Sequence, residues 1–153
     1  MSELRDLYQE VILDHGRHPR NNQAVDPETV HAHGHNPLCG DRLRLSIRLD
    51  PDGKIEKIGF TGSGCAISTA SASILTQVVE GLGREEVEAL FKKFQDLVTS
   101  DIETPVPDDP ALGKLLVFAG VREFPVRIKC ATLAWHTLHS ALEGDSARPA
   151  TTE

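Results

Sequence analysis

The sequence predicts an α+β protein in which helices pack on one face of a small antiparallel sheet, and two observations support this. Between Arg42 and Leu49, apolar and polar residues alternate strictly, which is typical of a half-buried strand. Before and after this region, apolar residues recur instead at intervals of three and four, as they do along helices that bury one face. The predicted order is a helix, a strand pair or small sheet, and then several helices, which is the order of an α+β domain.

Length and composition indicate one globular domain. A chain of 153 residues with 39% hydrophobic and 25% charged residues is long enough to bury a core. We expect the domain to span residues 1–143 and a flexible C-terminal tail to span 144–153. The sequence has neither a signal peptide nor an apolar run near the roughly 20 residues that cross a bilayer, so we expect a cytoplasmic protein with no membrane partner. The net charge of −7 argues against nucleic acid as a partner.

The first predicted elements are a helix and a hairpin. Apolar residues from Leu4 to Ile12 form a helical stripe, with Ser2 as N-cap and Gly16 as the end of the helix. In the alternating strand that follows, the inward residues are Leu43, Leu45, Ile47 and Leu49, and the outward residues are Arg42, Arg44, Ser46 and Arg48. A turn at 51–53 then leads into a second strand that passes through Phe60.

The remaining elements are helical. A helix of small residues is predicted from Ala66 to about Glu80, and an amphipathic helix from about Arg84 to Val98. A proline-rich loop over 104–110 precedes a short helix over 111–119. The last helix carries an apolar stripe from Ile128 to Leu142, with Cys130 in its first turn.

Three cysteines, Cys39, Cys65 and Cys130, are the candidates for chemistry. Their odd number and the lack of an export signal argue against a disulfide framework. Each stands where a loop meets a strand or a helix, and Asp41 follows Cys39 by two positions. Three isolated thiols packed in a core remain an alternative, because a lone cysteine is most often a small buried side chain. We expect the three thiols and Asp41 to meet around a metal ion.

The proposed ligand set suits zinc. Three thiolates and one carboxylate complete a tetrahedral site. Asp41 supplies a hard oxygen among soft sulfurs and is therefore the ligand expected to leave most readily. An exchangeable ligand favours transfer chemistry over a purely structural role. Lys129 and Arg127 lie next to Cys130 in the sequence and can offset the negative charge of such a site, whereas Arg42 is expected to point to solvent.

Three histidines alternate just before Cys39, at positions 31, 33 and 35. In an extended segment His31, His33 and His35 share one face and can bind a metal, or they can form a solvated edge of the sheet. The sequence assigns them no role.

Four segments resemble, in order, motifs of the U-type iron–sulfur cluster assembly proteins, which comprise IscU, SufU and the N-terminal domain of NifU. The first is LYQEVILDH at 7–15, followed by HPRN at 18–21. The other three are NPLCGD at 36–41, GCAIS at 64–68 and RIKC at 127–130. The resemblance covers about residues 4–142. It implies a SufE/NifU-like α+β fold whose exposed end carries Cys39, Asp41, Cys65 and Cys130 and binds Zn²⁺ or a nascent cluster.

Two features resemble the SufU branch. Residues 104–123 are similar to a segment that SufU-type chains carry before their third cysteine, and Lys129 stands where IscU-type chains have a histidine. FPVR at 124–127 replaces the IscU chaperone-recognition sequence. The resemblance implies a SufS-type cysteine desulfurase as partner, Cys39 as sulfur acceptor, Asp41 as exchangeable ligand, and iron–sulfur assembly or apo-proteins downstream.

Three functional hypotheses follow. The first is a zinc-dependent sulfurtransferase that accepts persulfide sulfur from the desulfurase. The second is a scaffold on which iron and sulfide form a [2Fe–2S] cluster that is then transferred. The third is a structural zinc domain. A cysteine hydrolase is disfavoured, because no histidine is tied by sequence to any one thiol.

Overall fold

Three antiparallel strands and a short parallel fourth strand form one sheet in the computed structural model, which describes residues 2–144 and 150–151. The strands are β1 (Val30–Asn36), β2 (Asp41–Leu49), β3 (Ile55–Ser63) and β4 (Ala150–Thr151), arranged in the order β3-β2-β1-β4. The two hairpins β1–β2 and β2–β3 are antiparallel, and β4 runs parallel to β1.

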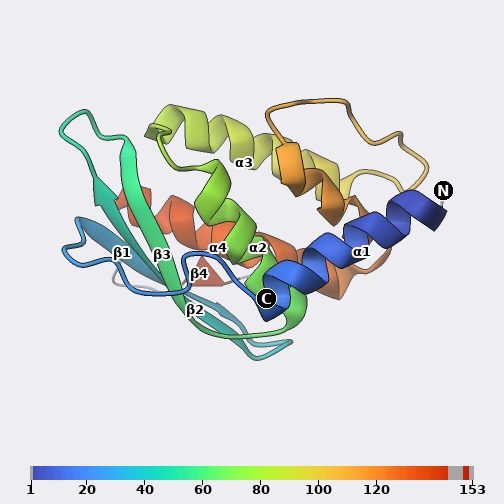
Figure 1. The fold of residues 1–153 in the computed structure, drawn as a ribbon, viewed down its shortest axis with the longest axis horizontal. Helices are drawn as coiled ribbons and strands as arrows, with labels where there is room; N and C mark the ends of the chain where they lie inside the picture. The colour runs from blue at the N-terminus through green and yellow to red at the C-terminus, as the bar shows by residue number, and fades with distance from the viewer. Residues whose placement is uncertain (1, 145–149, 152–153) are drawn as a thin grey trace.

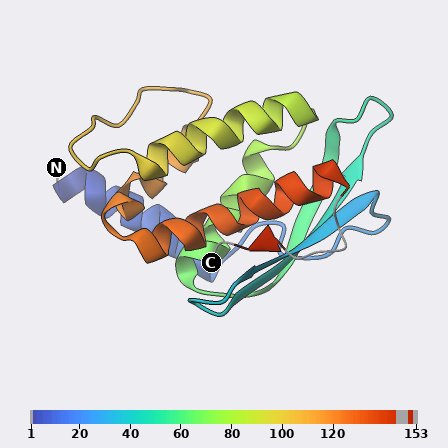
Figure 2. The same ribbon diagram turned by 180° about the vertical axis from the view of Figure 1, so that it is seen from behind.

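The helices gather on one face of this sheet, as the sequence predicts (Figures 1 and 2). They are α1 (Ser2–Arg17), α2 (Ala66–Val78), α3 (Arg84–Thr99), the 3₁₀ helix η1 (Gly113–Glu123) and α4 (Pro125–Glu143). Helix α4 packs against β1 and β2, while α2 lies between α4 and α1. The fold is therefore α+β, and the prediction is confirmed.

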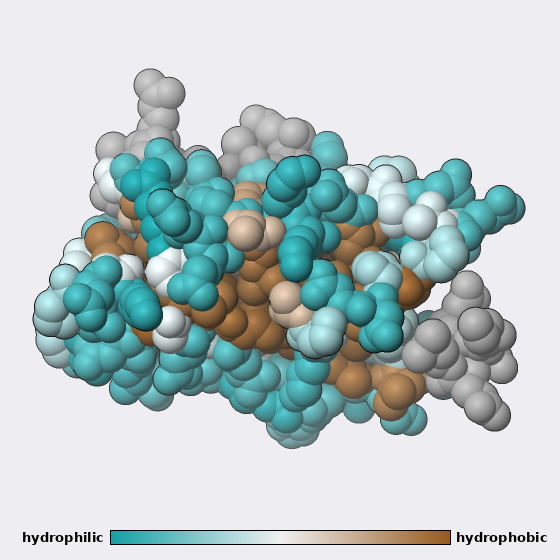
Figure 3. Space-filling view, turned by 90° about the horizontal axis from the view of Figure 1, so that it is seen from above, coloured by the Kyte–Doolittle hydropathy of each residue, from teal (hydrophilic) through white to brown (hydrophobic). Residues whose placement is uncertain are grey.

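Aromatic residues fill the core between α3, η1 and α4. Trp135 is fully buried and stacks on Phe94, with ring centroids 5.4 Å apart, and Phe94 in turn meets Phe118 edge-on at 5.7 Å. From the α3 side, apolar residues form a strip between hydrophilic side chains (Figure 3). Such a strip fits helices that bury one face only.

Helix α1 is attached to α2 by close packing and by a buried polar contact. A Cβ atom at Gly16 would lie 3.3 Å from Cβ of Ala66, so the end of α1 lies against the start of α2. His15 is buried, and its Nδ1 lies 2.7 Å from Oγ of Ser73. The Oγ atom of Ser73 also accepts a hydrogen bond from the backbone N–H of Arg20. These contacts fix the end of α1 beside the segment that carries Cys65.

Several details differ from the sequence-based prediction. Ser46 was expected to face outward but is buried, because residues 21–25 cross the outer face of the sheet and the backbone N–H of Val25 donates to Oγ of Ser46. Helix α4 begins at Pro125, so Cys130 lies in its second turn and not its first. The short helix predicted over 111–119 is a 3₁₀ helix over 113–123.

The two ends of the chain lie partly outside the described residues. Ala150 and Thr151 pair with Gly34 and His35 of β1. The rest of the predicted C-terminal tail, at 145–149 and 152–153, is not described, so its flexibility stays a prediction. Among the described helices, none combines the length and the apolar character needed to cross a membrane.

Candidate metal centre

The tip of the β1–β2 hairpin carries Cys39. Asn36 and Asp41 are the last pair of residues across the two strands, so residues 37–40 form the loop between them. Oδ1 of Asn36 accepts a hydrogen bond from the backbone N–H of Leu38 at 3.3 Å, an Asx turn that starts the reversal. Gly40 completes it at φ 70°, a left-handed conformation that favours glycine. The loop leaves Cys39 exposed to solvent.

Whereas Cys39 is exposed to solvent, the side chain of Asp41 points into the protein. Its side chain is completely buried, and each carboxylate oxygen accepts a hydrogen bond. Oδ1 accepts from the backbone N–H of Cys65 at 2.8 Å, and Oδ2 accepts from Nδ2 of Asn36 at 3.2 Å. Gly64 permits this approach, since a Cβ atom there would lie 2.8 Å from Oδ1 of Asp41. Two N–H donors thus offset much of the cost of burying the carboxylate.

Cys65 is the N-cap residue of α2. Its sulfur accepts a hydrogen bond from the backbone N–H of Ser68 at 3.4 Å, in place of the side-chain oxygen that usually caps a helix. Cys65 therefore lies at the positive end of the α2 helix dipole. Cys65 is half-buried, between the exposed Cys39 and the buried Cys130.

Cys130 brings α4 into the same cluster. Its side chain is 2% exposed, and its sulfur lies 3.2 Å from the sulfur of Cys39. A disulfide bond is about 2.05 Å long, so these are two free thiols in contact. Burial raises the pKa of Cys130 well above its usual range, and the contacts with Cys39 and Cys65 raise it further. Deprotonating this thiol therefore requires a compensating positive charge nearby.

The arrangement fits a metal ion of the zinc type. Ligand atoms of Cys39, Asp41 and Cys130 all lie within 4.8 Å of one another. The sulfur of Cys65 is not within that distance of all three, although Cys65 touches the cluster through its N–H bond to Asp41. In a tetrahedral site with bonds of about 2.3 Å, two sulfurs lie about 3.8 Å apart. Cys39 and Cys130 would have to separate slightly, which the exposed hairpin loop allows.

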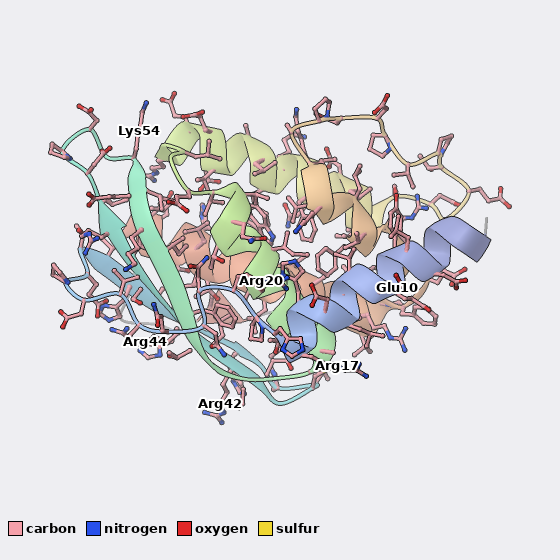
Figure 4. The ribbon with its side chains drawn as sticks, in the orientation of Figure 1. Glu10, Arg17, Arg20, Arg42, Arg44 and Lys54 are labelled. Atoms are coloured by element: carbon pink, nitrogen blue, oxygen red, sulfur yellow. The ribbon has the colours of Figure 1, made fainter. Side chains whose placement is uncertain are left out.

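A shallow groove of about 580 Å³ opens beside these thiols. All three cysteines line it, together with Ile67 and residues 123–127. Two of its lining residues are exposed apolar side chains, Phe124 at 42% and Val126 at 50%. Leu38, the neighbour of Cys39 in the sequence, is 58% exposed. The guanidinium of Arg127 lies 4.3 Å from the centre of the Phe124 ring. Arg42, in contrast, points away from the body of the molecule (Figure 4).

The alternating histidines do not join the thiols. His31, His33 and His35 lie on the outward face of β1, opposite Ser46, Arg44 and Arg42 of β2. His31 contacts Glu28 at 3.2 Å and meets His33 edge-on with ring centroids 5.9 Å apart. Within the part of the chain that the structure describes, none of the three belongs to a cluster of side chains close enough together to bind one metal ion.

A second group of possible ligands lies between α3 and α4 and consists of Glu88, His139 and Glu143. His139 bonds Glu88 at 2.5 Å, and Arg84 forms an ion pair with Glu143. Since Arg84 pairs with Glu143 and His139 contacts Glu88, this group is a surface network of polar contacts.

The sequence assigns no separate role to Asn36, which lies within the NPLCGD motif at 36–41. Its contact with Asp41 is visible only once the strand register makes the two residues partners. The one local indication was the asparagine two residues before Leu38, a residue type that forms Asx turns.

Comparisons with known proteins identify the family of the chain. Residues 7–150 match the NifU-like N-terminal domain family. An iron–sulfur cluster assembly scaffold protein IscU of Streptococcus pyogenes serotype M1 is 42% identical, over 94% of this chain and 87% of its own length. A zinc-dependent sulfurtransferase SufU of Bacillus subtilis (strain 168) is 40% identical, over 92% of both chains.

A solved structure gives the same result. It is described as a candidate iron–sulfur cluster assembly scaffold protein for the SUF system, from Fervidobacterium islandicum AW-1. It superposes with a TM-score of 0.78 at 29% identity and covers 87% of this chain and 94% of its own. The family match spans nearly the whole chain, and the similarity holds in both sequence and fold. The chain therefore belongs to the NifU-like N-terminal domain family of iron–sulfur cluster assembly proteins.

Proposed function

We propose that this protein acts in iron–sulfur cluster assembly as a zinc-binding sulfur acceptor, with Cys39, Asp41, Cys65 and Cys130 as the metal ligands. One observation carries the proposal: three free thiols and a buried carboxylate converge at one end of the fold, and only one of these thiols is exposed. The relative from B. subtilis, named as a zinc-dependent sulfurtransferase, supports this function.

The four proposed metal ligands have different roles. A zinc ion at this site would keep the thiols as thiolates at neutral pH, because thiolates are the form that binds metal. Cys130, buried in α4, and Cys65, at the start of α2, are held by their helices and serve as permanent ligands. Cys39 lies on an exposed loop and is therefore the ligand best able to meet a partner.

Sulfur transfer is a thiolate–persulfide exchange. The Cys39 thiolate attacks the outer, sulfane sulfur of a cysteine persulfide on the partner and forms a new S–S bond. The S–S bond of the donor breaks, and the donor cysteine leaves as a thiolate. One persulfide is lost and one is gained, so the step needs no external oxidant or reductant.

Asp41 suits the role of exchangeable ligand. The backbone N–H of Cys65 and the amide of Asn36 hydrogen-bond both of its oxygens without any metal. A carboxylate that leaves the ion is therefore not left buried and unpaired, which lowers the cost of releasing it.

The partner that fits this chemistry is a pyridoxal-phosphate-dependent cysteine desulfurase of the SufS type, which carries a persulfide. The groove beside the thiols gives access to Cys39, and the apolar side chains around it offer a surface for the partner to bury. Downstream, the sulfur would pass to iron–sulfur assembly proteins or apo-proteins.

A second candidate function is a scaffold on which a [2Fe–2S] cluster is assembled as cargo and handed on. The similarity to a protein named as an IscU scaffold favours it, and that relative is as similar to this chain as the sulfurtransferase is. The same three thiols and Asp41 supply the cysteine-rich ligand set that such clusters require.

The test is sulfur transfer to the Cys39→Ser variant. After incubation with a persulfide-loaded desulfurase, the wild-type protein should gain one sulfur atom on Cys39 by mass spectrometry, and desulfurase turnover should rise. The variant should show neither effect and should keep its fold, since the side chain is exposed. Undiminished stimulation by the variant would exclude Cys39 as acceptor, and iron with equimolar sulfide in the isolated protein would favour the scaffold.

A further inference from the structure

Asn36 is a buried polar residue whose side chain is fully engaged. It is 0% exposed, at the end of β1. Its amide oxygen accepts from the backbone N–H of Leu38. Because the amide nitrogen can only donate, this contact fixes the orientation of the amide group. The NH₂ group must therefore face inward, toward the thiol cluster.

The two N–H groups of this amide reach two proposed ligands. Nδ2 lies 3.2 Å from Oδ2 of Asp41 on the neighbouring strand. It also lies 3.5 Å from the sulfur of Cys130, which is 94 residues away in the sequence and belongs to α4. One amide thus connects the Cys39 loop, strand β2 and helix α4.

We propose that Asn36 is a positioning residue of the metal centre, which orients Asp41 and Cys130 through its two N–H groups and fixes the Cys39 loop through its amide oxygen. This inference rests on the metal site proposed above and adds a residue outside the ligand set. Asn36 is also the one side chain in the described residues that donates an N–H hydrogen bond to either ligand.

The chemistry of the site explains why an amide suits this position. A divalent ion with three thiolates and a carboxylate carries a net charge near −2, and N–H donors to the anionic ligands stabilise it. A neutral amide gives two such donors without adding a charge that must itself be buried. Removing partners of this kind typically weakens metal binding by about 10–100-fold.

The test compares metal binding by wild type, Asn36→Ala and Asn36→Asp. The aspartate has the same shape and keeps an acceptor for the Leu38 N–H, but it lacks both donors. Thr137→Val is the matched control. Thr137 of α4 packs against Gly34, which lies on the same strand as Asn36, and within the described residues its hydroxyl donates only to the carbonyl of Leu133 in its own helix. Cobalt(II) titration measures affinity and gives a sulfur-to-metal charge-transfer band, and thermal unfolding of the metal-free proteins shows whether each variant folds.

Both Asn36 variants should bind cobalt about 10–100-fold more weakly than wild type. Their charge-transfer bands should move to longer wavelength, because a sulfur without its N–H donor is a better electron donor. Thr137→Val should match wild type in both respects. Wild-type affinity and an unshifted band in a folded Asn36→Asp protein would overturn the role of Asn36 alone, whereas a wild-type protein that binds no metal would overturn the proposed site as well.

Discussion

At the scale of single residues, Asp41 is the most constrained member of the centre. It is fully buried, and its neighbours on three sides are the Cys65 backbone, the Asn36 amide and Gly64. The sequence suggested that Asp41 is a ligand because a carboxylate follows Cys39 by two positions. It did not suggest that the carboxylate would be held by two N–H donors, which depends on contacts between residues far apart in the chain.

Gly64 gives a direct test of how closely Asp41 must be held. In Gly64→Ala the new methyl group would lie 2.8 Å from Oδ1 of Asp41, so the carboxylate or the start of α2 must shift. We expect a loss of about 1–3 kcal/mol in the free energy of unfolding, typical of overpacking, together with faster zinc release to a chelator.

The matched control for this substitution is Gly120→Ala. A Cβ atom at Gly120 meets no other atom within 4 Å, and its backbone is not in the left-handed region. This variant should be as stable as wild type and should release zinc at the same rate. Wild-type behaviour of Gly64→Ala would show that Asp41 has room to move and that its tight packing is not required.

At the scale of elements, the contact between α1 and α2 holds the start of α2, which follows Cys65, against the rest of the fold. Burial, together with the positive charges of Arg20 and Lys114, holds the pKa of His15 down at about 4, while Asp14 acts in the opposite direction. Unfolded histidine titrates near 6.5. Between about pH 6.5 and pH 4 the unfolded chain therefore binds a proton that the folded protein does not.

Folding stability should consequently fall as the pH drops from 6.5 toward 4, by up to about 1.4 kcal/mol per pH unit for this one group. The measurement is the unfolding free energy of the metal-free protein from pH 7 to pH 4.5. His15→Gln should flatten this dependence, while His33→Gln, at an exposed position on β1, should leave it unchanged. If the unfolding free energy of wild type and of His15→Gln depended on pH with the same slope, His15 would not be the cause of this pH dependence.

Regular elements were predictable where one physical pattern dominates. The Arg42–Leu49 strand alternates because one face is buried by helices. The structure departs from the pattern at Ser46, where a loop from elsewhere in the chain covers the outer face, and at Leu49, which is only half-buried next to a register shift. The start of α4 is harder to predict from the sequence, because Pro125 is the first residue of the helix and not part of the loop before it.

At the scale of the whole molecule, the fold brings three segments that are distant in sequence to one end. The β1–β2 hairpin supplies Cys39 and Asp41, the loop before α2 supplies Cys65, and α4 supplies Cys130. Placement of the cysteines near element ends indicated that they could meet, and the family resemblance named the same residues. The distances, the burial of Asp41 and Cys130, and the amide of Asn36 are products of tertiary packing that local sequence patterns do not contain.

The most direct test of the account is metal and acid-labile sulfide analysis of the protein purified without oxygen from its own host, beside a variant with all three cysteines changed to serine. We predict about one zinc per chain and no sulfide in wild type, and neither metal nor sulfide in the variant. Wild-type protein without metal, or a variant that keeps its zinc, would contradict the claim that these thiols form the metal centre.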